Sequence, residues 1–434
     1  MINNICDKIQ KSYDQLFFKS GTKSTFYDFL ENFKKDNSLE TYEKSLLELD
    51  NWGFDENGNY GHISKKFFSI KGIRFQDMEF PIIDQPEIGI LGVLCTYFEG
   101  VLHFLVQLKD EPGNELRHQL SPTVQATKSN YTTVHGGKVP YYLDYFLNEN
   151  NSRILFDQYL SEQGLRYYKK RNRNMIVLVD NQIEVKPGFF WLTLGQIYEL
   201  FSQPLFINAC LRSVLSMLPK SVFMNYCDNY FFNILNSKLI RRKENFDFNS
   251  TLVDLSILKG WGLQYDGIFK SHESKYFSLV GLQIIGNSRE VSKWCQPLLK
   301  ESGPGQYGLI LGDIDGKLCC FWKIVSEPGL FDKVELGPTW IIRSGESTKS
   351  VLLDEFITKG QELQSILMPE EGGRFYHSNF LHTIINIGEV SSDALGDEFI
   401  ALDADQTYFS NTILSNLNIE ARSLWFTCKN EWFY

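Results

Sequence analysis

Short apolar or alternating runs are the main pattern in the first half of the chain, and they predict β-strands. Strands are expected at residues 67–75, 88–96, 102–108 and 175–179. Apolar residues spaced for one helix face predict helices at residues 141–148, 194–201 and 211–218. Strands thus mix with fewer helices and without strict alternation, which favours an α+β fold with a mixed or antiparallel sheet.

The same pattern occurs a second time along the chain. The segment WGFDENGNYGHISKKFFSIKGIRF at 52–75 matches WGLQYDGIFKSHESKYFSLVGLQI at 261–284, with the tryptophans 209 positions apart (261 − 52 = 209). Further matches keep their order at offsets of 208 to 216: EPG at 111–113 with 327–329, PT at 122–123 with 338–339, EQGLRYY at 162–168 with EEGGRFY at 370–376, and NACLRS at 208–213 with NIEARS at 418–423. This period far exceeds that of solenoid repeats, so each copy should have its own core.

The duplication divides the chain into four parts. We assign an N-terminal helical segment to residues 1–45, a first repeat to 46–217, a helical linker to 218–250 and a second repeat to 251–434. Apolar Phe26, Phe29, Leu30 and Phe33 are spaced for one helix face and should pack the N-terminal segment on the first repeat. The basic run KLIRRK at 238–243 is most simply a solvated helix end.

Composition and charge exclude several classes of protein. With 43% hydrophobic and 22% charged residues the chain is an ordinary globular one, and its net charge of −10 disfavours a general nucleic-acid binder. No apolar run is long enough to span a bilayer, and the N-terminus lacks the pattern of an export signal. The eight cysteines form no CxxC pair. We therefore expect a cytoplasmic protein with reduced thiols and no membrane partner.

A polar stretch, QLSPTVQATKSNYTTVH at 119–135, follows a predicted strand and the Glu-Pro-Gly turn. Its short Gln, Asn, Ser and Thr side chains suit fixed hydrogen bonds better than a solvated charged surface. A Ser/Thr-rich surface loop is the plain alternative. A long polar segment held between a strand and a turn is also what a site for a polar small molecule requires, and we predict such a site here.

A cationic stretch, RYYKKRNRN at 166–174, precedes the strand-like MIVLV. Because alternate side chains of a strand face opposite sides of the sheet, two or three of its cations could enter one pocket. Arginine forks there would suit a diphosphate. The alternative is an exposed basic edge strand that guards against aggregation.

The two copies share their scaffold and differ in their polar residues. After Pro-Thr the first copy continues VQATKSNYTTVHGG and the second WIIRSGESTKS. After the aromatic pair at 167–168 the first copy reads KKRNRN, and the second reads HSNFLH at the corresponding point. The first repeat is therefore the expected active one, and the second is a relic, a dimer platform or another ligand site.

Several chemistries lack their motifs. The sequence has no P-loop, no GxGxxG after a strand, no HExxH and no GxSxG. His377 and His382 lie five apart, which is more typical of a structural pair than of a metal site. We expect neither a metal nor a redox cofactor.

Five segments of the first repeat resemble the NDP-hexose 2,3-dehydratases of deoxysugar biosynthesis: DQPEIGILG (84–92), EPGN (111–114), QLSPTVQATKSNYTTVHGG (119–137), SEQGLRYYKKRNRN (161–174) and WLTLGQI (191–197). In the second repeat WCQPLL (294–299) and EEGGRFYH (370–377) are similar to that family too. The resemblance implies two tandem Nudix-like domains, a homodimer and a nucleotide-diphosphate-linked 4-keto-6-deoxyhexose, with dTDP-4-keto-6-deoxyglucose expected. It departs at Cys210, where the family carries an acid that Glu420 keeps in the second repeat.

The implied reaction removes the C3 proton and the C2 hydroxyl and gives a 3,4-diketo-2,6-dideoxyhexose, the substrate of a following 3-ketoreductase. The resemblance makes His135 or Tyr131 the expected group for proton transfer and Glu162 a base or an orienting group. Sugar and carbonyl contacts are expected from Gln119, Thr123, Gln125, Ser129 and Asn130, diphosphate contacts from Arg166, Lys170, Arg171 and Arg173, and nucleotide contacts from Thr193 and Gln196. The other substrate-binding candidates are Asn114, Ser121, Asn172 and Asn174.

Two other functions stay open. A non-catalytic sugar-nucleotide-binding protein would carry the same ligand contacts without activity. A diphosphate hydrolase would need Mg²⁺ and clustered glutamates, a pattern that the sequence lacks.

Overall fold

In the computed structural model the described residues are 2–15, 22–128, 139–147, 153–179, 183–220, 229–246, 248–273, 277–287, 291–344, 346, 350–412 and 415–433. The helices are α1 (Ile2–Asp14), α2 (Thr22–Asp36), α4 (Asp144–Leu147), α5 (Leu194–Phe201), α6 (Ala209–Leu215), α7 (Asn229–Asn245), α8 (Val351–Lys359), α9 (Ala404–Thr412) and α10 (Ile419–Thr427). Short 3-10 helices are η1 (Leu46–Glu48), η2 (Leu255–Ile257) and η3 (Asn430–Phe433). None of the described helices is long and apolar enough to cross a membrane.

Each repeat contains a seven-stranded core sheet, and the two sheets correspond strand by strand. The first consists of β6 (Gly89–Phe98), β7 (Val101–Asp110), β8 (His118–Pro122), β9 (Val124–Ala126), β10 (Arg153–Ser161), β11 (Arg171–Leu178) and β12 (Phe189–Leu192). The second consists of β18 (Gly305–Ile314), β19 (Lys317–Ser326), β20 (Val334–Gly337), β21 (Trp340–Ile342), β22 (Gln361–Pro369), β24 (Asn379–Glu389) and β25 (Phe399–Leu402). One parallel pair lies among antiparallel pairs in each sheet, β11 with β6 and β24 with β18. The expected α+β fold with mixed sheets and two repeated halves is confirmed.

Each repeat also carries a smaller sheet, and the repeats exchange one strand between these sheets. The first small sheet consists of β2 (Trp52–Phe54), β3 (Tyr60–His62), β4 (Ser69–Phe75), β5 (Met78–Asp84) and β13 (Ser250–Val253). The second consists of β14 (Trp261–Leu263), β15 (Phe269–Ser271), β16 (Ser278–Gly286), β17 (Lys293–Lys300), β23 (Phe375–Tyr376) and β1 (Leu39–Lys44). Strand β1 lies just before the first repeat yet pairs with β16, and β13 lies at the start of the second repeat yet pairs with β4. The strand exchange ties the repeats together at both of their starts.

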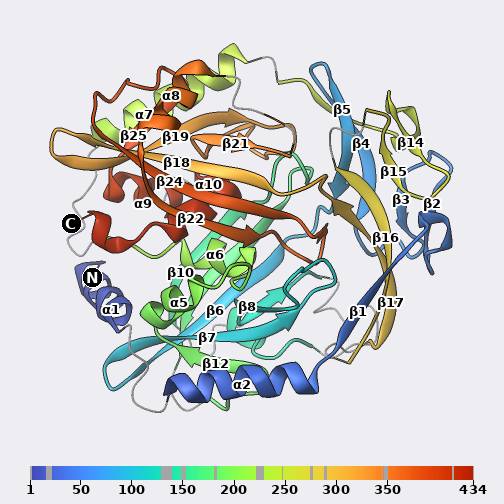
Figure 1. Cartoon of the computed structure of the whole chain (residues 1–434), viewed down its shortest axis with the longest axis horizontal. Coiled ribbons are helices and arrows are strands. Elements are labelled where there is room, and N and C mark those ends of the chain that lie inside the picture. Colours follow the sequence, from blue (N-terminus) through green and yellow to red (C-terminus); the bar gives the residue numbers. More distant parts are fainter. Residues whose placement is uncertain are drawn as a thin grey trace.

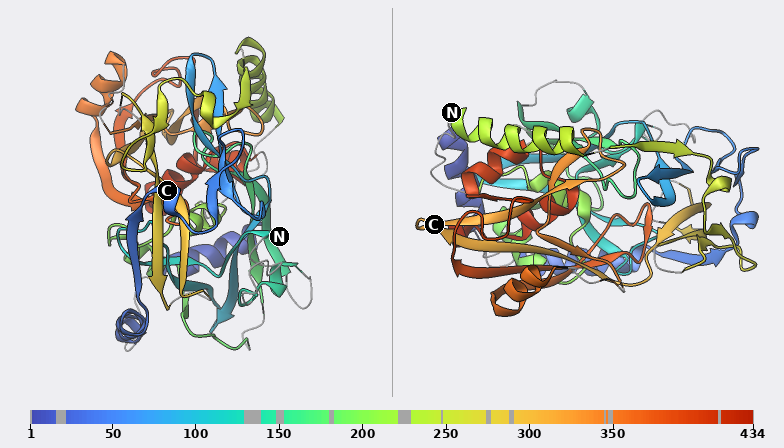
Figure 2. Two further views of the ribbon diagram at one scale, coloured as in Figure 1. Left: turned by 90° about the vertical axis from the view of Figure 1, so that its right-hand side faces the viewer. Right: turned by 90° about the horizontal axis from the view of Figure 1, so that it is seen from above.

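The views show the two core sheets side by side with α6 and α10 between them, and the two small sheets together at one end (Figure 1, Figure 2). The small sheets share one hydrophobic core, in which Trp52 and Trp261 are both buried. Each indole donates to the other repeat's backbone, Trp52 Nε1 to Cys295 O and Trp261 Nε1 to Glu79 O, both at 2.8 Å. Tryptophan accounts for these contacts because it combines a large apolar ring with one N–H donor.

Most of the predicted elements are present. The strands expected at 67–75, 88–96, 102–108 and 175–179 correspond to β4, β6, β7 and β11, and the helices at 194–201 and 211–218 to α5 and α6. Phe26 and Leu30 of α2 are buried against the first sheet, as their spacing predicts. The helix predicted at 141–148 is a single turn, α4, because Tyr142 adopts a φ of +64° just before it.

Two buried arginines join the repeats where α6 meets α10. Arg212 Nε donates to Ser423 Oγ (2.7 Å), and Arg422 Nε donates to Ser213 Oγ (3.1 Å). The remaining guanidinium nitrogens bond backbone carbonyls of both repeats: Arg212 reaches Ile207 O (2.5 Å) and Pro369 O (2.7 Å), and Arg422 reaches Leu417 O (2.6 Å) and Ser161 O (2.5 Å). The two arginines are 0% and 1% exposed, so their donors depend on these acceptors.

We predict that Arg212→Met destabilises the whole chain. The variant leaves the buried acceptors Ile207 O, Pro369 O and Ser423 Oγ without a donor, which should cost roughly 3 kcal/mol or more. Urea unfolding measures the loss, and Arg241→Met on the exposed face of α7 is the control, expected within about 0.5 kcal/mol of wild type. Equal unfolding midpoints for the two variants would contradict the role of Arg212.

Candidate active site

A cavity of about 690 Å³ lies between the repeats, and both of them line it. The first small sheet contributes Trp52, His62, Phe67 and Phe68, the first core sheet Lys109, Glu111 and Gln125, and the start of α6 Cys210. The second repeat contributes Trp294, Cys295 and Gln296 from β17 and Glu371, Gly373 and Arg374 from the turn before β23. Aromatic rings thus face a wall of polar and charged side chains.

The turn of the second repeat reaches the first cavity because two backbones approach very closely. Gly113 N donates to Gly372 O at 2.8 Å, and His377 N donates to Gly113 O at 2.8 Å. A Cβ atom at Gly113 would lie 1.7 Å from Phe375 O, so only glycine fits there. The symmetric contact repeats this arrangement, with Gly329 N donating to Gly164 O at 2.7 Å.

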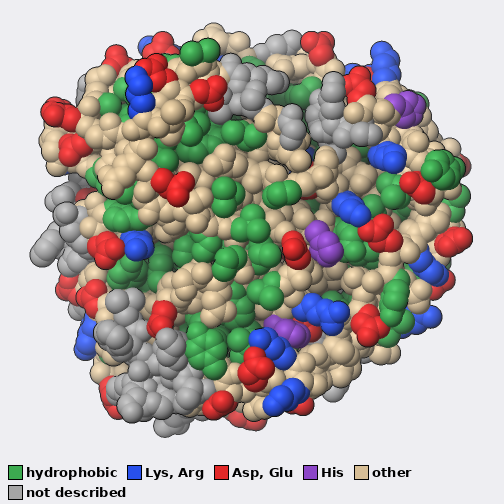
Figure 3. All heavy atoms as spheres, viewed as in Figure 1, with side chains coloured by type: hydrophobic (Ala, Val, Ile, Leu, Met, Phe, Trp, Pro, Cys, Tyr) green, Lys and Arg blue, Asp and Glu red, His purple; other side chains and the backbone are tan. Residues whose placement is uncertain are grey.

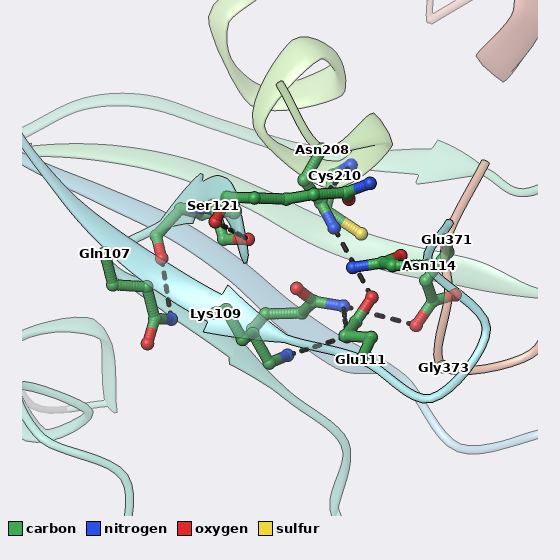
Figure 4. A network of polar contacts seen from close by, with 12 residues as sticks. Gln107, Lys109, Glu111, Asn114, Ser121, Asn208, Cys210, Glu371 and Gly373 are labelled. Atoms are coloured by element: carbon green, nitrogen blue, oxygen red, sulfur yellow. Dashed lines mark hydrogen bonds and ion pairs between the residues drawn. The ribbon is translucent and has the colours of Figure 1, made fainter. Parts of the chain in front are cut away.

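Glu111 is the centre of the polar wall. Its carboxylate pairs with Lys109 Nζ at 3.0 Å and accepts from Gln125 Nε2 at 3.1 Å and from Asn208 Nδ2 at 3.4 Å. The side chain is 3% exposed, so the ion pair keeps a buried charge compensated. Figure 4 shows this network between strand β7 and the start of α6, with Glu371 beside it.

Glu371 continues the wall from the second repeat. Its Oε1 accepts from Gln125 Nε2 at 3.2 Å and its Oε2 accepts from Tyr167 Oη at 3.1 Å. Gln125 therefore bridges two carboxylates that come from different repeats. Burial, and then the Glu371 carboxylate, raise the pKa of Tyr167 well above its usual value, so the phenol stays protonated and donates.

Behind this wall lies a third carboxyl group, Glu162. Burial, and then the Glu371 carboxylate, raise the pKa of Glu162 to about 7. Asn172 Nδ2 donates to Glu162 at 2.5 Å. Burial also lowers the pKa of the nearby Lys170 ammonium, whose Nζ donates to Glu87 O. The protein environment thus shifts the pKa of both Glu162 and Lys170, and shifted pKa values are typical of functional sites.

The second repeat has a corresponding cavity of about 640 Å³ with different chemistry. Trp261, Phe277, Arg166 and Glu301 are among its lining residues. Arg166 lies over the Phe277 ring at 4.1 Å and bonds Glu301 with Nε and Nη2, at 3.0 and 2.5 Å. Arg166 is therefore already neutralised by a carboxylate of the same wall, while Arg74, Lys259 and Arg343 also line this cavity.

Comparison with known proteins identifies the family. A family model described as NDP-hexose 2,3-dehydratase matches residues 23–218 and again residues 234–427. The chain belongs to the NDP-hexose 2,3-dehydratase family. It is 34% identical to a dTDP-4-dehydro-6-deoxy-α-D-glucopyranose 2,3-dehydratase of Saccharopolyspora spinosa over 92% of this chain and 90% of the relative. Similar proteins with the same name occur in Streptomyces violaceoruber (34%, over 87% of this chain and 90% of the relative) and Amycolatopsis orientalis (32%, over 87% and 84%).

For this dehydratase the structure places the polar stretch 119–135 at the cavity only in part. Gln125 lines the cavity, whereas Ser129, Asn130, Tyr131 and His135 lie outside the described residues. The other polar candidates of this stretch are buried in or beside β8. Thr123 Oγ1 donates to Leu105 O and accepts from Leu94 N, Ser121 Oγ donates to Gln119 O, and the Gln119 amide has no partner among the described residues.

The cationic stretch 166–174 is divided among several places. Lys170 and Asn172 line the first cavity, and Arg166 lines the second. Arg171 pairs with Asp332, and Arg173 pairs with Asp157 at 2.6 Å. Asn174 accepts from Ser213 Oγ at 3.0 Å. The cations therefore do not converge on one point, because the chain turns at Lys169 (φ +50°) before β11 begins.

Three other candidates have clear structural contacts. Thr193 and Gln196 form a capping box at the start of α5, with each side chain accepting from the other's backbone N–H. Asn114 follows the Glu-Pro-Gly turn and packs against Gly372 of the second repeat.

Sequence reasoning missed Lys109, Glu111, Glu371 and Arg374. Glu111 lies in a Glu-Pro-Gly turn that both repeats share, so a comparison of the two copies does not distinguish it from scaffold residues. Glu371 lies in the second repeat, whereas the comparison of the two copies predicts the active site in the first. The sequence does contain a signal for Glu371. When the two copies are aligned, Glu371 of the second matches Gln163 of the first, so the carboxyl group occurs in one copy only.

We predict that Glu162→Gln changes how stability depends on pH. Glu162 has a raised folded-state pKa of about 7 against an unfolded value of 4.5, so its ionisation destabilises the wild type as pH rises through this range. In the variant no such ionisation occurs. The free energy of unfolding of Glu162→Gln minus that of wild type should therefore rise by roughly 2–3 kcal/mol between pH 5 and pH 8.

Urea unfolding at both pH values measures the change. Glu184→Gln on an exposed loop is the control, since the side chain of Glu184 is 76% exposed and should show no such trend. A difference between Glu162→Gln and wild type that is constant with pH would contradict the prediction.

Proposed function

We propose that this dehydratase acts on dTDP-4-keto-6-deoxyglucose and removes the C2 hydroxyl to give the 3,4-diketo-2,6-dideoxy sugar nucleotide. The supporting observation is the Lys109–Glu111–Gln125–Glu371 network on the wall of a cavity of about 690 Å³, in a chain of this family. The named relatives carry this sugar nucleotide in their names.

The chemistry needs no oxidant or reductant because the substrate already has a ketone at C4. That ketone acidifies the C3 proton, so a base can remove it and leave an enolate at C3–C4. When the ketone re-forms, the electron pair makes a C2=C3 double bond, and the C2 hydroxyl takes up a proton and departs as water. The C3 hydroxyl of this 2,3-enol then loses its proton and C2 gains one, which gives the 3,4-diketone. The protein must supply a base at C3, a donor at the C4 oxygen and an acid for the departing oxygen.

The cavity wall offers groups for these tasks. Lys109, held by Glu111, is a cation placed to donate to the developing C4 enolate. We assign His135 or Tyr131 to proton transfer, with Glu162 orienting the polar residues around it. Gln119, Thr123, Gln125, Ser129 and Asn130 would form or support the sugar-binding surface.

The remaining walls suit a nucleotide diphosphate. Phe67 and Trp294, which line the cavity and are partly exposed, offer rings on which a base can stack. Lys170, Lys293 and Arg374 line the same cavity and are the cations available to the diphosphate. Arg374 lies over the Phe68 ring at 4.2 Å, which holds its guanidinium at the cavity wall.

We also propose that each repeat is Nudix-like and that the chain forms a homodimer in the cytoplasm and passes its product to a 3-ketoreductase. Apolar side chains exposed in the middle of the face in Figure 3 support a partner surface. The seven described cysteines are buried and unpaired, which fits a reducing compartment. Light scattering of the purified protein would test the dimer.

We predict that the purified protein converts dTDP-4-keto-6-deoxyglucose in the presence of a 3-ketoreductase and NADPH. The trapped product should be a sugar nucleotide lighter than the substrate by one oxygen atom, detected by mass spectrometry. Omitting the protein is the control. Absence of water loss from dTDP-, GDP- and CDP-linked substrates would refute the proposed function.

We predict that His135→Ala or Tyr131→Phe lowers kcat by about 10²–10⁴-fold, because general acid catalysis contributes about that much. The variants should still bind dTDP, seen as a shift of the melting temperature with ligand. A non-catalytic binding protein would bind the ligand without any turnover in wild type. Full activity in both variants would remove these two residues from the mechanism.

A further inference from the structure

Besides the exposed Asp50, which lines the first cavity, three less exposed carboxyl groups lie at or behind it, and their surroundings differ. Glu111 is 3% exposed and pairs with Lys109 at 3.0 Å. Glu162 is 5% exposed, is not among the lining residues and accepts from Asn172. Glu371 is partly exposed and lines the cavity, and no salt bridge reaches it in the described part of the chain. Of these three, only Glu371 lines the cavity without a direct ion pair among the described residues.

Both oxygens of Glu371 are held by neutral donors. Gln125 Nε2 donates to Oε1 at 3.2 Å, and Tyr167 Oη donates to Oε2 at 3.1 Å. These neutral hydrogen bonds fix the direction of the carboxylate. Oε1 still has lone-pair capacity for a substrate proton, since a carboxylate has about four acceptor sites.

The backbone beside Glu371 leaves its carboxylate open. A Cβ atom at Gly373 would lie 3.1 Å from Glu371 Oε1 and 3.5 Å from Glu111 Oε1. Glycine at this position therefore keeps a side chain away from the two carboxylates. Figure 4 shows Gly373 on the same turn as Glu371, beside Glu111.

The first repeat offers an internal comparison, because the turn that brings Leu165 and Arg166 to the second cavity corresponds to the turn of Glu371 and carries Gln163 at the matching position. Gln163 O accepts from the amides of residues 166 and 167 at 3.0 and 2.9 Å, and Glu371 O accepts from those of residues 374 and 375 at 3.1 and 3.0 Å. The turns are thus built alike. An amide cannot take up a proton at neutral pH, whereas a carboxylate can.

The partners of Glu371 are replaced there as well. Strand pairing shows which positions of the two repeats are equivalent. Tyr167, which bridges to Ile83, corresponds to Phe375, which pairs with Leu299. In the same way Gln125, which pairs with Leu91, corresponds to Ile341, which pairs with Tyr307. Leu165 takes the place of Gly373 and lines the second cavity. All four changes remove the proton-accepting arrangement from the second cavity, although the scaffold is the same.

We propose that Glu371, supplied by the second repeat, is the base that removes the C3 proton in the first cavity. The C3–H bond breaks, its proton goes to the Glu371 carboxylate, and its electron pair forms the C3–C4 enolate. The C2–O bond then breaks, the hydroxyl takes up one proton and leaves as water, and the C2=C3 double bond forms. The proton held by Glu371 balances the one consumed in this step, which restores the carboxylate, and the resulting 2,3-enol tautomerises to the 3,4-diketone. Tyr167 and Gln125 are positioning residues. This assignment rests on the proposed function.

We predict that Glu371→Gln lowers kcat by about 10²–10⁴-fold while KM changes only a few-fold, because the variant loses a proton acceptor and keeps the shape of the wall. The coupled assay with dTDP-4-keto-6-deoxyglucose measures both constants, and thermal melting verifies folding. The matched control is Glu370→Gln. Glu370 is the adjacent carboxyl, but it faces Gln163 and Tyr307 of the other network, so its variant should keep kcat within about threefold.

Two further variants distinguish a base from a structural residue. Glu371→Ala should regain part of its turnover when formate is added, since a small carboxylate can occupy the vacated space. Gly373→Leu, which copies the residue of the second cavity, should lower kcat/KM by about tenfold or more by covering the carboxylate. A structural role for Glu371 predicts neither the rescue nor normal folding with lost turnover.

The outcomes separate this assignment from the proposed function. An active wild type together with a Glu371→Gln variant of similar kcat overturns the assignment alone. A wild type without water loss overturns the proposed function and the assignment with it. Equal losses in Glu371→Gln and Glu370→Gln would also overturn the assignment, because they would indicate general damage to the turn.

Discussion

The crossed hydrogen bonds of Arg212 and Arg422 hold the two repeats in one fixed relation. Each guanidinium is buried between α6 and α10 and bonds a serine of the opposite helix as well as a carbonyl of the opposite repeat. Water cannot replace a lost acceptor of a buried cation, so the positions of the protein acceptors are strongly constrained. Because Pro369 O and Ser161 O are among these acceptors, the turns that begin there are fixed as well.

Those turns build the cavities. The turn after Pro369 crosses to the first repeat and brings Glu371 and Arg374 to the cavity between Trp52 and Glu111. The turn after Ser161 crosses the other way and brings Arg166 to the second cavity. Neither cavity is complete within one repeat, so the duplicated chain acts as a single unit. The strand exchange of β1 and β13 reinforces the same dependence at the small sheets.

The two repeats share one scaffold but bury different charged side chains at matching positions. The second repeat buries Glu327, Glu335, Glu370 and Glu420, and burial raises the pKa of each. Related positions in the first repeat hold Glu111, Gln119, Glu162 and Cys210. At these four positions the first repeat therefore holds two carboxyl groups fewer than the second, whereas Glu371 of the second repeat matches Gln163 of the first.

The sequence alone determined the duplication, the mixed α+β fold, the three central strands of the first core sheet and the family resemblance, because these depend on local periodicity and on long motifs. It also identified Gln125 and Lys170 as site candidates. Only the tertiary structure decided that Thr193 caps α5, that Arg166 belongs to the second cavity, and that Glu371 of the second repeat faces the first. Hydrophobic spacing specifies which face of an element is buried. It does not specify which repeat supplies the opposite wall, because that depends on contacts between residues about 200 positions apart, such as Arg212 with Ser423.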